Sequence, residues 1–140
     1  MNRMAMIEEL VEFFISEHIV VHGAKAVGGF NAPPEIINNG FGDSRPRIPD
    51  VIGLDKGKRR VVFGIVRCAR GELDSEEALT DYNVFLDHRA EKGTEASVLY
   101  VLLPQTLLHE FTGIITHYIH REYWHRILPI VSKHPLHADG

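Results

Sequence analysis

The chain has 140 residues, of which 44% are hydrophobic and 24% charged, and its net charge at pH 7 is −4. These values are typical of one globular domain, because a chain of this length buries about two-thirds of its unfolded surface on folding. No apolar run approaches the roughly 18 residues that a membrane-spanning helix needs, and the single cysteine excludes an intramolecular disulfide. We therefore expect one domain, residues 1–140, without a membrane partner and in the reducing cytoplasm.

The basic residues are unevenly distributed along the chain. Eight lysines and arginines lie between Arg45 and Arg70, where only Asp50 and Asp55 oppose them. That segment carries a charge of +6, so the rest of the chain, by difference from −4, carries −10. A basic stripe on an acidic body can steer a polyanion to one face of the protein. The alternative is that the cations of residues 56–60 only solvate a hairpin turn.

The first predicted element is an amphipathic helix over residues 3–18. Its apolar residues recur at helical spacing and form one face: Met4, Ile7, Leu10, Val11, Phe14 and Ile15. At about 100° per residue, Glu8 lies on a flank of this face and Glu9 points away from it. Glu8 is therefore the acidic residue expected to border a buried cleft, unless it is simply a solvated flank residue.

The next segment predicts strands and a long loop. Residues 19–27 favour a first strand, and residues 30–46, rich in Gly, Pro and Asn, favour a loop of low regularity. Residues 49–54 and 59–66 then form a predicted hairpin. Its second strand is apolar on both faces, which is typical of a central strand covered on two sides.

The remainder of the chain alternates helix and strand. A helix capped by Asp74 or Ser75 is followed by the most apolar strand, residues 97–103, and by a helix over about residues 106–121. Residues 127–131 predict an edge strand or a dimer contact, because their proline excludes a central strand.

The element order is therefore helix, strand, hairpin, helix, strand, helix. Because a helix connects strand 59–66 to strand 97–103, these two strands are expected to be parallel neighbours joined by a right-handed crossover. The predicted class is α/β, with a mixed β-sheet flanked by helices.

The hairpin also carries a motif. Asp50 follows Pro49 at its opening, and the side chains at positions 65 and 67 point to the same side of the next strand. This layout resembles the PD-(D/E)XK nuclease superfamily, which includes restriction endonucleases and archaeal Holliday-junction resolvases. Members carry an Asp after a Pro on one strand, then an acidic residue and a Lys two positions later on the next, and often a Glu on the first helix. The resemblance implies a restriction-endonuclease-like core (α-β-β-β-α-β-α) over about residues 4–121, with residues 122–140 as a C-terminal extension.

Two positions depart from the superfamily pattern. In active members the two carboxylates bind Mg²⁺, which activates a water for attack on the phosphate, and the Lys stabilises the developing charge. On this chain the second carboxylate position falls on Ile65, which cannot bind a hard cation. The Lys position falls on Arg67, which keeps the positive charge but cannot relay a proton.

The resemblance nevertheless implies a set of candidate site residues. Asp50, Arg67 and Glu8 are the candidate catalytic residues. Asp50, Glu8 and Glu77 are the candidate metal ligands, for weakly bound Mg²⁺ or for no metal at all, with Glu72 and Glu76 as alternatives from the segment after the hairpin. Basic residues can contact phosphates without a metal, and the candidates are Arg45, Arg47, Lys58, Arg59, Arg60 and Arg70.

Three functions follow as hypotheses. The first is a nuclease-like domain with a degraded metal site that binds DNA or RNA without catalysis, or serves an assembly as an accessory. The second is an active Mg²⁺-dependent endonuclease that takes its missing carboxylate from the following helix. The third is a protein-interaction scaffold, in which the acidic body and the His-rich C-terminal segment serve a homodimer or another protein.

The C-terminal third adds weaker patterns. His117 and His120 share a helical face and could bind a transition metal with a third donor, although solvent-facing or interface histidines are the more ordinary interpretation. The aromatic residues Tyr118, Tyr123 and Trp124 predict a core or dimer contact rather than a platform for stacking bases.

Overall fold

The computed structural model describes residues 3–37, 45–88 and 95–133. Parts of the predicted loop and C-terminal extension, residues 38–44 and 134–140, therefore lie outside the described residues. The elements, in chain order, are α1 (Arg3–Ser16), β1 (Val20–Ala24), β2 (Val51–Asp55), β3 (Arg60–Val66), η1 (Arg70–Glu72), α2 (Glu76–Asp87), β4 (Val98–Leu103), α3 (Gln105–Tyr118), η2 (Arg121–Arg126) and β5 (Ile127–Val131).

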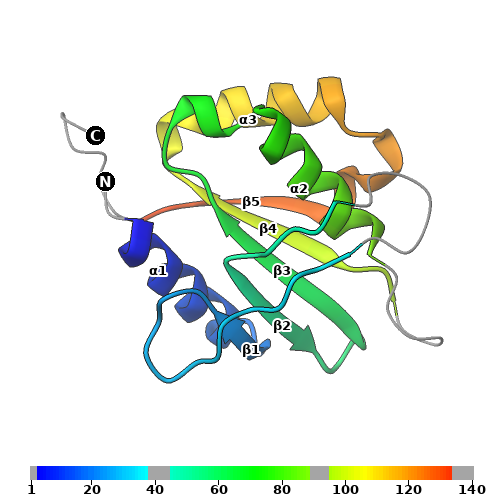
Figure 1. Cartoon of the computed structure of the whole chain (residues 1–140). Coiled ribbons are helices and arrows are strands. Elements are labelled where there is room, and N and C mark those ends of the chain that lie inside the picture. The colour runs from blue at the N-terminus through cyan, green and yellow to red at the C-terminus, as the bar shows by residue number, and fades with distance from the viewer. Residues whose placement is uncertain (1–2, 38–44, 89–94, 134–140) are drawn as a thin grey trace.

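The strands form one mixed sheet in the order β1-β2-β3-β4-β5 (Figure 1). β1, β2 and β3 are antiparallel neighbours, whereas β4 is parallel to β3 and β5 is parallel to β4. The helix α2 connects β3 to β4, and α3 connects β4 to β5 through η2. The predicted α/β class is therefore confirmed, as are the parallel pairing of the two central strands and the edge position of β5.

Helices cover both faces of the sheet, and β3 is buried between them. Alternate side chains of β3 enter two different cores: Val66 packs with α1 around Phe14, and Ile65 packs with α2 and α3 around Phe111. Gly64 lets α1 approach the strand closely, because a Cβ atom there would lie 2.7 Å from a methyl carbon of Leu10. The apolar sequence of β3 is the consequence of this two-sided burial.

The buried face of α1 is turned relative to the prediction. Met6 is fully buried, whereas Met4 and Ile15 are 48% and 57% exposed. This turn moves the face away from Glu8, which is exposed, and toward Glu9, which is half-buried. Apolar spacing alone allowed both faces, because methionines stand at positions 4 and 6 alike.

Glu9 ties α1 to the end of β5. Its carboxylate accepts hydrogen bonds from the Ser132 hydroxyl and from the Lys133 amide, both at 2.7 Å. Glu9, which helical spacing places away from the apolar face of α1, therefore contacts the end of the last strand. The helical wheel could not show this contact, because it depends on where the last strand ends.

The helix ends follow local chemistry closely. Ser75 caps α2 as predicted, with its hydroxyl accepting from the Ala78 amide at 3.1 Å. His18, the second residue after the end of α1, has a left-handed φ of 60°, and the Ile19 amide donates back to the Phe14 carbonyl at 2.9 Å. α3 ends at Tyr118, earlier than predicted, and the chain then forms η2.

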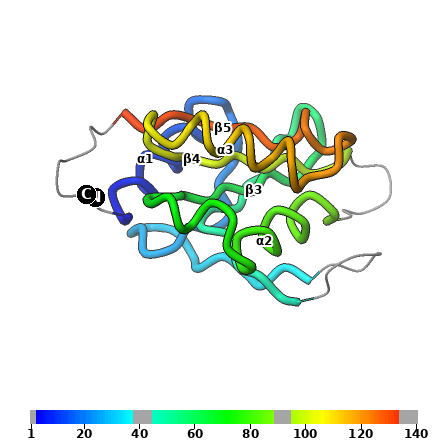
Figure 2. The backbone as a smooth tube through the Cα atoms, turned by 90° about the horizontal axis from the view of Figure 1, so that it is seen from above, coloured from blue at the N-terminus to red at the C-terminus, as the bar shows by residue number. Residues whose placement is uncertain are grey.

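The segment between β1 and β2 runs along the outer side of α2. Figure 2 shows α2 lying between this segment and α3. Ile36 and Arg47 pair through both backbone amides, at 2.7 and 3.0 Å, and Ile36 enters the core beneath α2. The residues that lead into β2 therefore lie against α2, the helix that follows β3.

The outer edge of β5 lacks one hydrogen-bond donor. The Ser132 amide donates to the Leu103 carbonyl of β4 at 2.8 Å. Because main-chain groups alternate along a strand, residues 128 and 130 also face β4, and residues 127, 129 and 131 face outward. Residue 129 is Pro129, so the middle outward position carries no N–H.

Candidate functional site

Asp50 lies directly before β2, at the end of the hairpin where β2 begins and β3 ends, here named the Asp50 end. Its carboxylate is buried and both oxygens are occupied. Oδ2 accepts a hydrogen bond from the Val66 amide at 2.8 Å, and Oδ1 lies 3.3 Å from the Lys25 ammonium nitrogen. The Lys25 amide also donates to the Asp50 carbonyl at 2.9 Å, so the pairing of β1 with β2 places this lysine.

Arg67 follows β3 and is buried against α2. Its Nη2 donates to Asp81 Oδ2 at 3.0 Å and its Nε to the Tyr82 hydroxyl at 3.3 Å. The guanidinium carbon lies 5.3 Å from the centroid of the Tyr82 ring. The second oxygen of Asp81 accepts from Arg47 Nε. Asp81 therefore bridges two arginines, one from each side of the hairpin opening.

The protonation states of this cluster follow from burial. Burial opposes the charge on Arg67, but its contacts with Tyr82 and Asp81 outweigh burial and hold the arginine pKa above its usual value. Burial likewise raises the pKa of Tyr82, which keeps the phenol protonated. The Tyr82 hydroxyl can therefore donate to the Leu73 carbonyl, 2.7 Å away, while it accepts from Arg67.

Ile65 occupies the position where the superfamily pattern has its second carboxylate. Its side chain is 2% exposed and belongs to the core formed with α2 and α3. The neighbouring backbone is also paired, since the Asp50 amide donates to the Gly64 carbonyl at 3.0 Å. This position is a packing position in the present fold.

The other predicted ligands lie apart from Asp50 or have other partners. Glu8 is exposed on α1, and Glu77 is exposed in the first turn of α2. Glu76 pairs with Arg45 at 3.0 Å. Glu72 accepts from the Cys68 amide at 2.6 Å and also pairs with Arg3 at the start of α1.

The donor set does not fit a hard divalent cation. Mg²⁺ needs several oxygens that converge at about 2.1 Å. Among residues 3–37, 45–88 and 95–133, no three Asp, Glu, His or Cys side chains are grouped so as to hold one ion. At Asp50 the neighbouring groups are an ammonium and an amide, and at Asp81 they are two guanidinium groups. We name these contacts the ion-pair network: Lys25–Asp50, and Arg47–Asp81–Arg67 with Tyr82.

The predicted basic residues separate into two groups. Those near the Asp50 end have acidic partners: Arg45 pairs with Glu76, Arg47 and Arg67 share Asp81, and Arg70 pairs with Glu110 at 2.6 Å. Those of the turn between β2 and β3 lie at the opposite end of the hairpin. A strand of five residues separates the two groups by roughly 17 Å.

The turn, residues 56–59, is here named the hairpin tip. Lys58 and Arg59 are exposed there together with Lys56. Arg60 is half-buried at the base of the tip, with its Nε 3.8 Å from a carboxylate oxygen of Asp55. The basic stripe that the sequence suggests is therefore divided between the two ends of the hairpin, and the cations of the tip lie apart from Asp50.

Three residues of the network were missed by sequence analysis: Lys25, Asp81 and Tyr82. A pattern did exist for Asp81, because it stands three residues after Ala78 and four before Phe85 on the buried face of α2. An acidic residue within an apolar helical stripe needs a partner. Lys25 offered no such pattern, because its contact with Asp50 depends on strand pairing.

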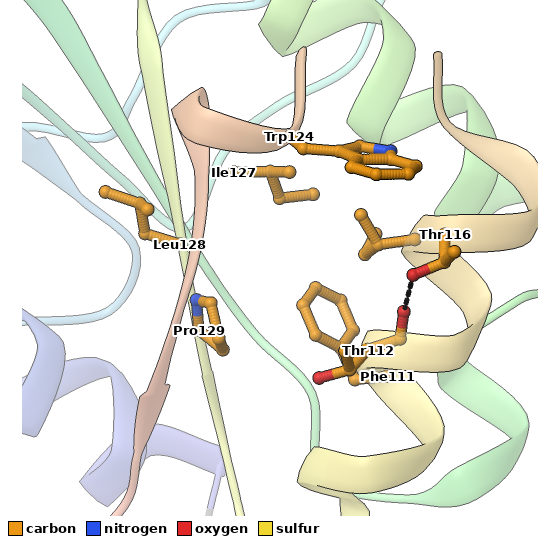
Figure 3. Close-up of a pocket in the computed structure, with 8 residues that line it drawn as sticks. Phe111, Thr112, Thr116, Trp124, Ile127, Leu128 and Pro129 are labelled. Atoms are coloured by element: carbon orange, nitrogen blue, oxygen red, sulfur yellow. Dashed lines mark hydrogen bonds between the residues drawn. The ribbon is translucent and has the colours of Figure 1, made fainter. Parts of the chain in front are cut away.

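A separate pocket of about 290 Å³ lies between α3 and β5 (Figure 3), and its wall residue Phe111 contacts Tyr82, with ring centroids 6.0 Å apart. Phe111, Trp124 and Pro129 contribute to its walls. Its polar groups are satisfied internally: Thr116 donates to the Thr112 carbonyl at 2.8 Å, and Trp124 Nε1 donates to the Ile119 carbonyl at 2.9 Å. The walls therefore present mainly apolar surface.

Comparisons with protein-family models, with curated proteins and with solved structures give no match to the chain. Within the described residues, no helix has the length and apolar character needed to cross a membrane.

Proposed function

We propose that this chain is a nuclease-like domain in which the ion-pair network stands in place of the metal site, and that it binds nucleic acid without hydrolysing it. The observation that carries the proposal is the environment of the Asp50 carboxylate. One oxygen accepts from the Val66 amide, and the other faces the Lys25 ammonium at 3.3 Å. A lysine of the chain thus supplies the positive charge that a metal supplies in active members of the superfamily.

The nuclease-like part of the proposal rests on the order and placement of elements. The chain runs α1, β1, β2, β3, α2, β4, α3, which is the order that the resemblance implies. Pro49 and Asp50 precede β2, and Arg67 follows β3 on the same side of the sheet as Ile65 and α2. This support is topological, because the motif itself is short.

The non-catalytic part rests on charge. A divalent cation at Asp50 would have to displace Lys25 and would meet no second carboxylate from β3, because Ile65 lies in the core. The carboxylate of Asp81 already faces two guanidinium groups. Cations repel one another strongly in a buried site, so these groups disfavour a metal as well as failing to bind it.

The nucleic-acid part rests on the exposed cations. Lysine and arginine bind phosphates without a metal, and such binding weakens as salt rises because counterions are released. Among the described residues, exposed cations occur at the hairpin tip and on the segments around Asp50. This chemistry serves DNA and RNA alike, since both carry the same phosphates.

The test combines metal titration with nucleic-acid binding. Calorimetry with Mg²⁺ and Mn²⁺ is expected to show no saturable heat, for the wild type or for Asp50→Ala. Labelled DNA and RNA duplexes are expected to bind with an affinity that falls steeply with salt, and to stay intact in Mg²⁺. Saturable heat that Asp50→Ala abolishes would instead support the endonuclease. Absence of binding to any nucleic acid at low salt would overturn the proposal.

One observation favours a second candidate, a homodimerisation scaffold. Trp124 is 39% exposed at one end of the apolar pocket, and the edge strand β5 lines the side of the pocket that faces α3 (Figure 3). Exposed aromatic side chains next to an apolar pocket are common at protein interfaces. Sedimentation equilibrium would show a concentration-dependent dimer that Trp124→Ser weakens. A monomer at all concentrations would exclude this candidate.

A further inference from the structure

We infer that the phosphate contacts of this domain are made by the hairpin tip, and not by the Asp50 end where the sequence pattern places the site. The inference rests on the proposed function, because it names the surface through which nucleic acid is bound. The tip joins β2 to β3 at the end of the sheet opposite to the one where β2 begins (Figure 1).

The first argument concerns which cations are available. At the Asp50 end a phosphate has to compete with carboxylates that already hold the arginines, such as Glu76 on Arg45 and Glu110 on Arg70. At the tip, Lys56, Lys58 and Arg59 are exposed and make no ion pair within residues 3–37, 45–88 and 95–133. A phosphate can therefore bind there without displacing an internal partner.

The second argument concerns the acidic residue of the turn. Asp55 ends β2, and its Oδ1 accepts a hydrogen bond from the Lys58 backbone amide at 3.2 Å. Its Oδ2 faces Arg60, 3.8 Å away at the base of the tip. The carboxylate is thus used to shape the turn and to neutralise Arg60, and it makes no ion pair with Lys56, Lys58 or Arg59.

The third argument concerns the backbone at Arg59. This residue ends a four-residue loop with a left-handed φ of 54°. Hairpin loops prefer Gly or Asn at a position of this kind, because a Cβ atom is strained there. An arginine in this position places a cation at the tip in spite of backbone strain, and such strain is concentrated at functional positions.

The chemistry of the tip also limits what is recognised. Its side chains are ammonium and guanidinium groups, without an aromatic ring for stacking or an amide for reading adenine. We therefore expect contacts with the phosphodiester backbone and no sequence preference. Three cations correspond to about three phosphates, which gives a salt slope of about −2.7 on a DNA duplex.

The experiment compares two triple variants of equal charge. The tip variant is Lys56→Gln, Lys58→Gln and Arg59→Gln. The second variant, Arg3→Gln, Arg45→Gln and Arg70→Gln, tests the competing surface by removing three paired arginines near the Asp50 end. Because both lower the net charge by three, long-range attraction is matched, and any difference reports local contacts.

Fluorescence anisotropy is measured for each protein with a DNA duplex, an RNA duplex and a single strand, over a range of salt concentrations. The tip variant is expected to lose most of the wild-type salt slope of about 2.7, about 0.9 for each phosphate contact, and the second variant less than about 0.9. Thermal melts establish that both variants are folded. If the triple variant is unstable, the single tip substitution Lys56→Gln repeats the test, with an expected loss of about one unit of salt slope.

The two possible failures are distinguishable. If the wild type binds none of the three nucleic acids at low salt, the proposed function itself is overturned. If the wild type binds and the second variant loses at least as much slope as the tip variant, the inference about the tip is wrong while the proposed function stands. Equal binding of sequence-scrambled duplexes supports backbone recognition, and a strong sequence preference contradicts it.

Discussion

The two ends of the β2–β3 hairpin use the same kinds of residue in opposite ways. At the Asp50 end the cations are paired with Asp50 and Asp81, and much of the ion-pair network is buried beside α2. At the hairpin tip the cations face solvent on a strained turn. A charged side chain that is buried needs a partner of opposite charge, whereas one that stays exposed to solvent is available to bind a ligand. Cations that are adjacent in sequence therefore need not form one surface.

The largest effect is expected from placing a carboxylate at position 65, where the superfamily pattern has one. Ile65→Glu places an acidic group in a core position that is 2% exposed, so we expect a loss of about 4 kcal/mol or more in the free energy of unfolding. Urea denaturation measures it. Ile65→Val is the control and should cost about 1 kcal/mol. A stable Ile65→Glu protein that binds Mg²⁺ would show instead that the Asp50 end is a latent metal site.

The next largest effect is expected at Arg67. Arg67→Met leaves the buried Asp81 with only the partly exposed Arg47, and should lower the free energy of unfolding by about 3 kcal/mol. Arg70→Met removes an exposed ion pair and should change it by less than about 1 kcal/mol. Replacing both members, Arg67→Met with Asp81→Leu, should recover part of the loss. Equal effects at Arg67 and Arg70 would contradict the difference in burial on which the comparison depends.

A smaller effect of opposite sign is expected at the tip. Arg59→Gly relieves a left-handed backbone and should raise the free energy of unfolding by about 1 kcal/mol. The same substitution at Arg60, which lies in β3, should be destabilising because glycine weakens a strand. The urea denaturation midpoints of the two variants, compared with that of the wild type, measure both changes in stability. A loss of stability in Arg59→Gly would mean that its side chain has a structural role at the tip.

The smallest effect is expected between the two ends, at His88. This histidine packs edge-on against Phe63 with ring centroids 5.4 Å apart, and burial lowers its pKa below the usual 6.5. The unfolded chain therefore takes up this proton at a higher pH than the folded one. The histidine has no effect above about pH 7, and it destabilises the fold progressively as the pH falls below 6.5. The melting temperature of the wild type, relative to that of His88→Gln, should therefore fall as the pH is lowered from 7.5 to 5.

The sequence predicted the fold better than the site. β3 and β4 are apolar on both faces, which identifies central strands, and the helix between them requires a parallel crossover. The rotation of α1 was not predictable, because Met4 and Met6 give equally regular apolar faces. The edge position of β5 followed from a property of one residue, the missing amide of Pro129.

At the site, the sequence predicted where Asp50 and Arg67 lie but not what they contact. Both do lie at the same end of the hairpin. Their partners come from β1 and α2, and those contacts depend on strand register and on helix rotation, which no local pattern contains. The roles of Asp50, Glu8 and Glu77 as metal ligands stay predictions.

The missing donor of Pro129 has a consequence for how copies of this chain meet. A sixth strand added to β5 would find no N–H at its centre and would meet the proline ring instead. At the other edge, β1 shifts register between Val21 and Gly23, and the Ala24 amide is already taken by the Asn31 carbonyl at 2.9 Å. Both margins of the sheet therefore resist growth into fibrils. Copies of the chain that associate are therefore expected to meet through side chains rather than through added strands.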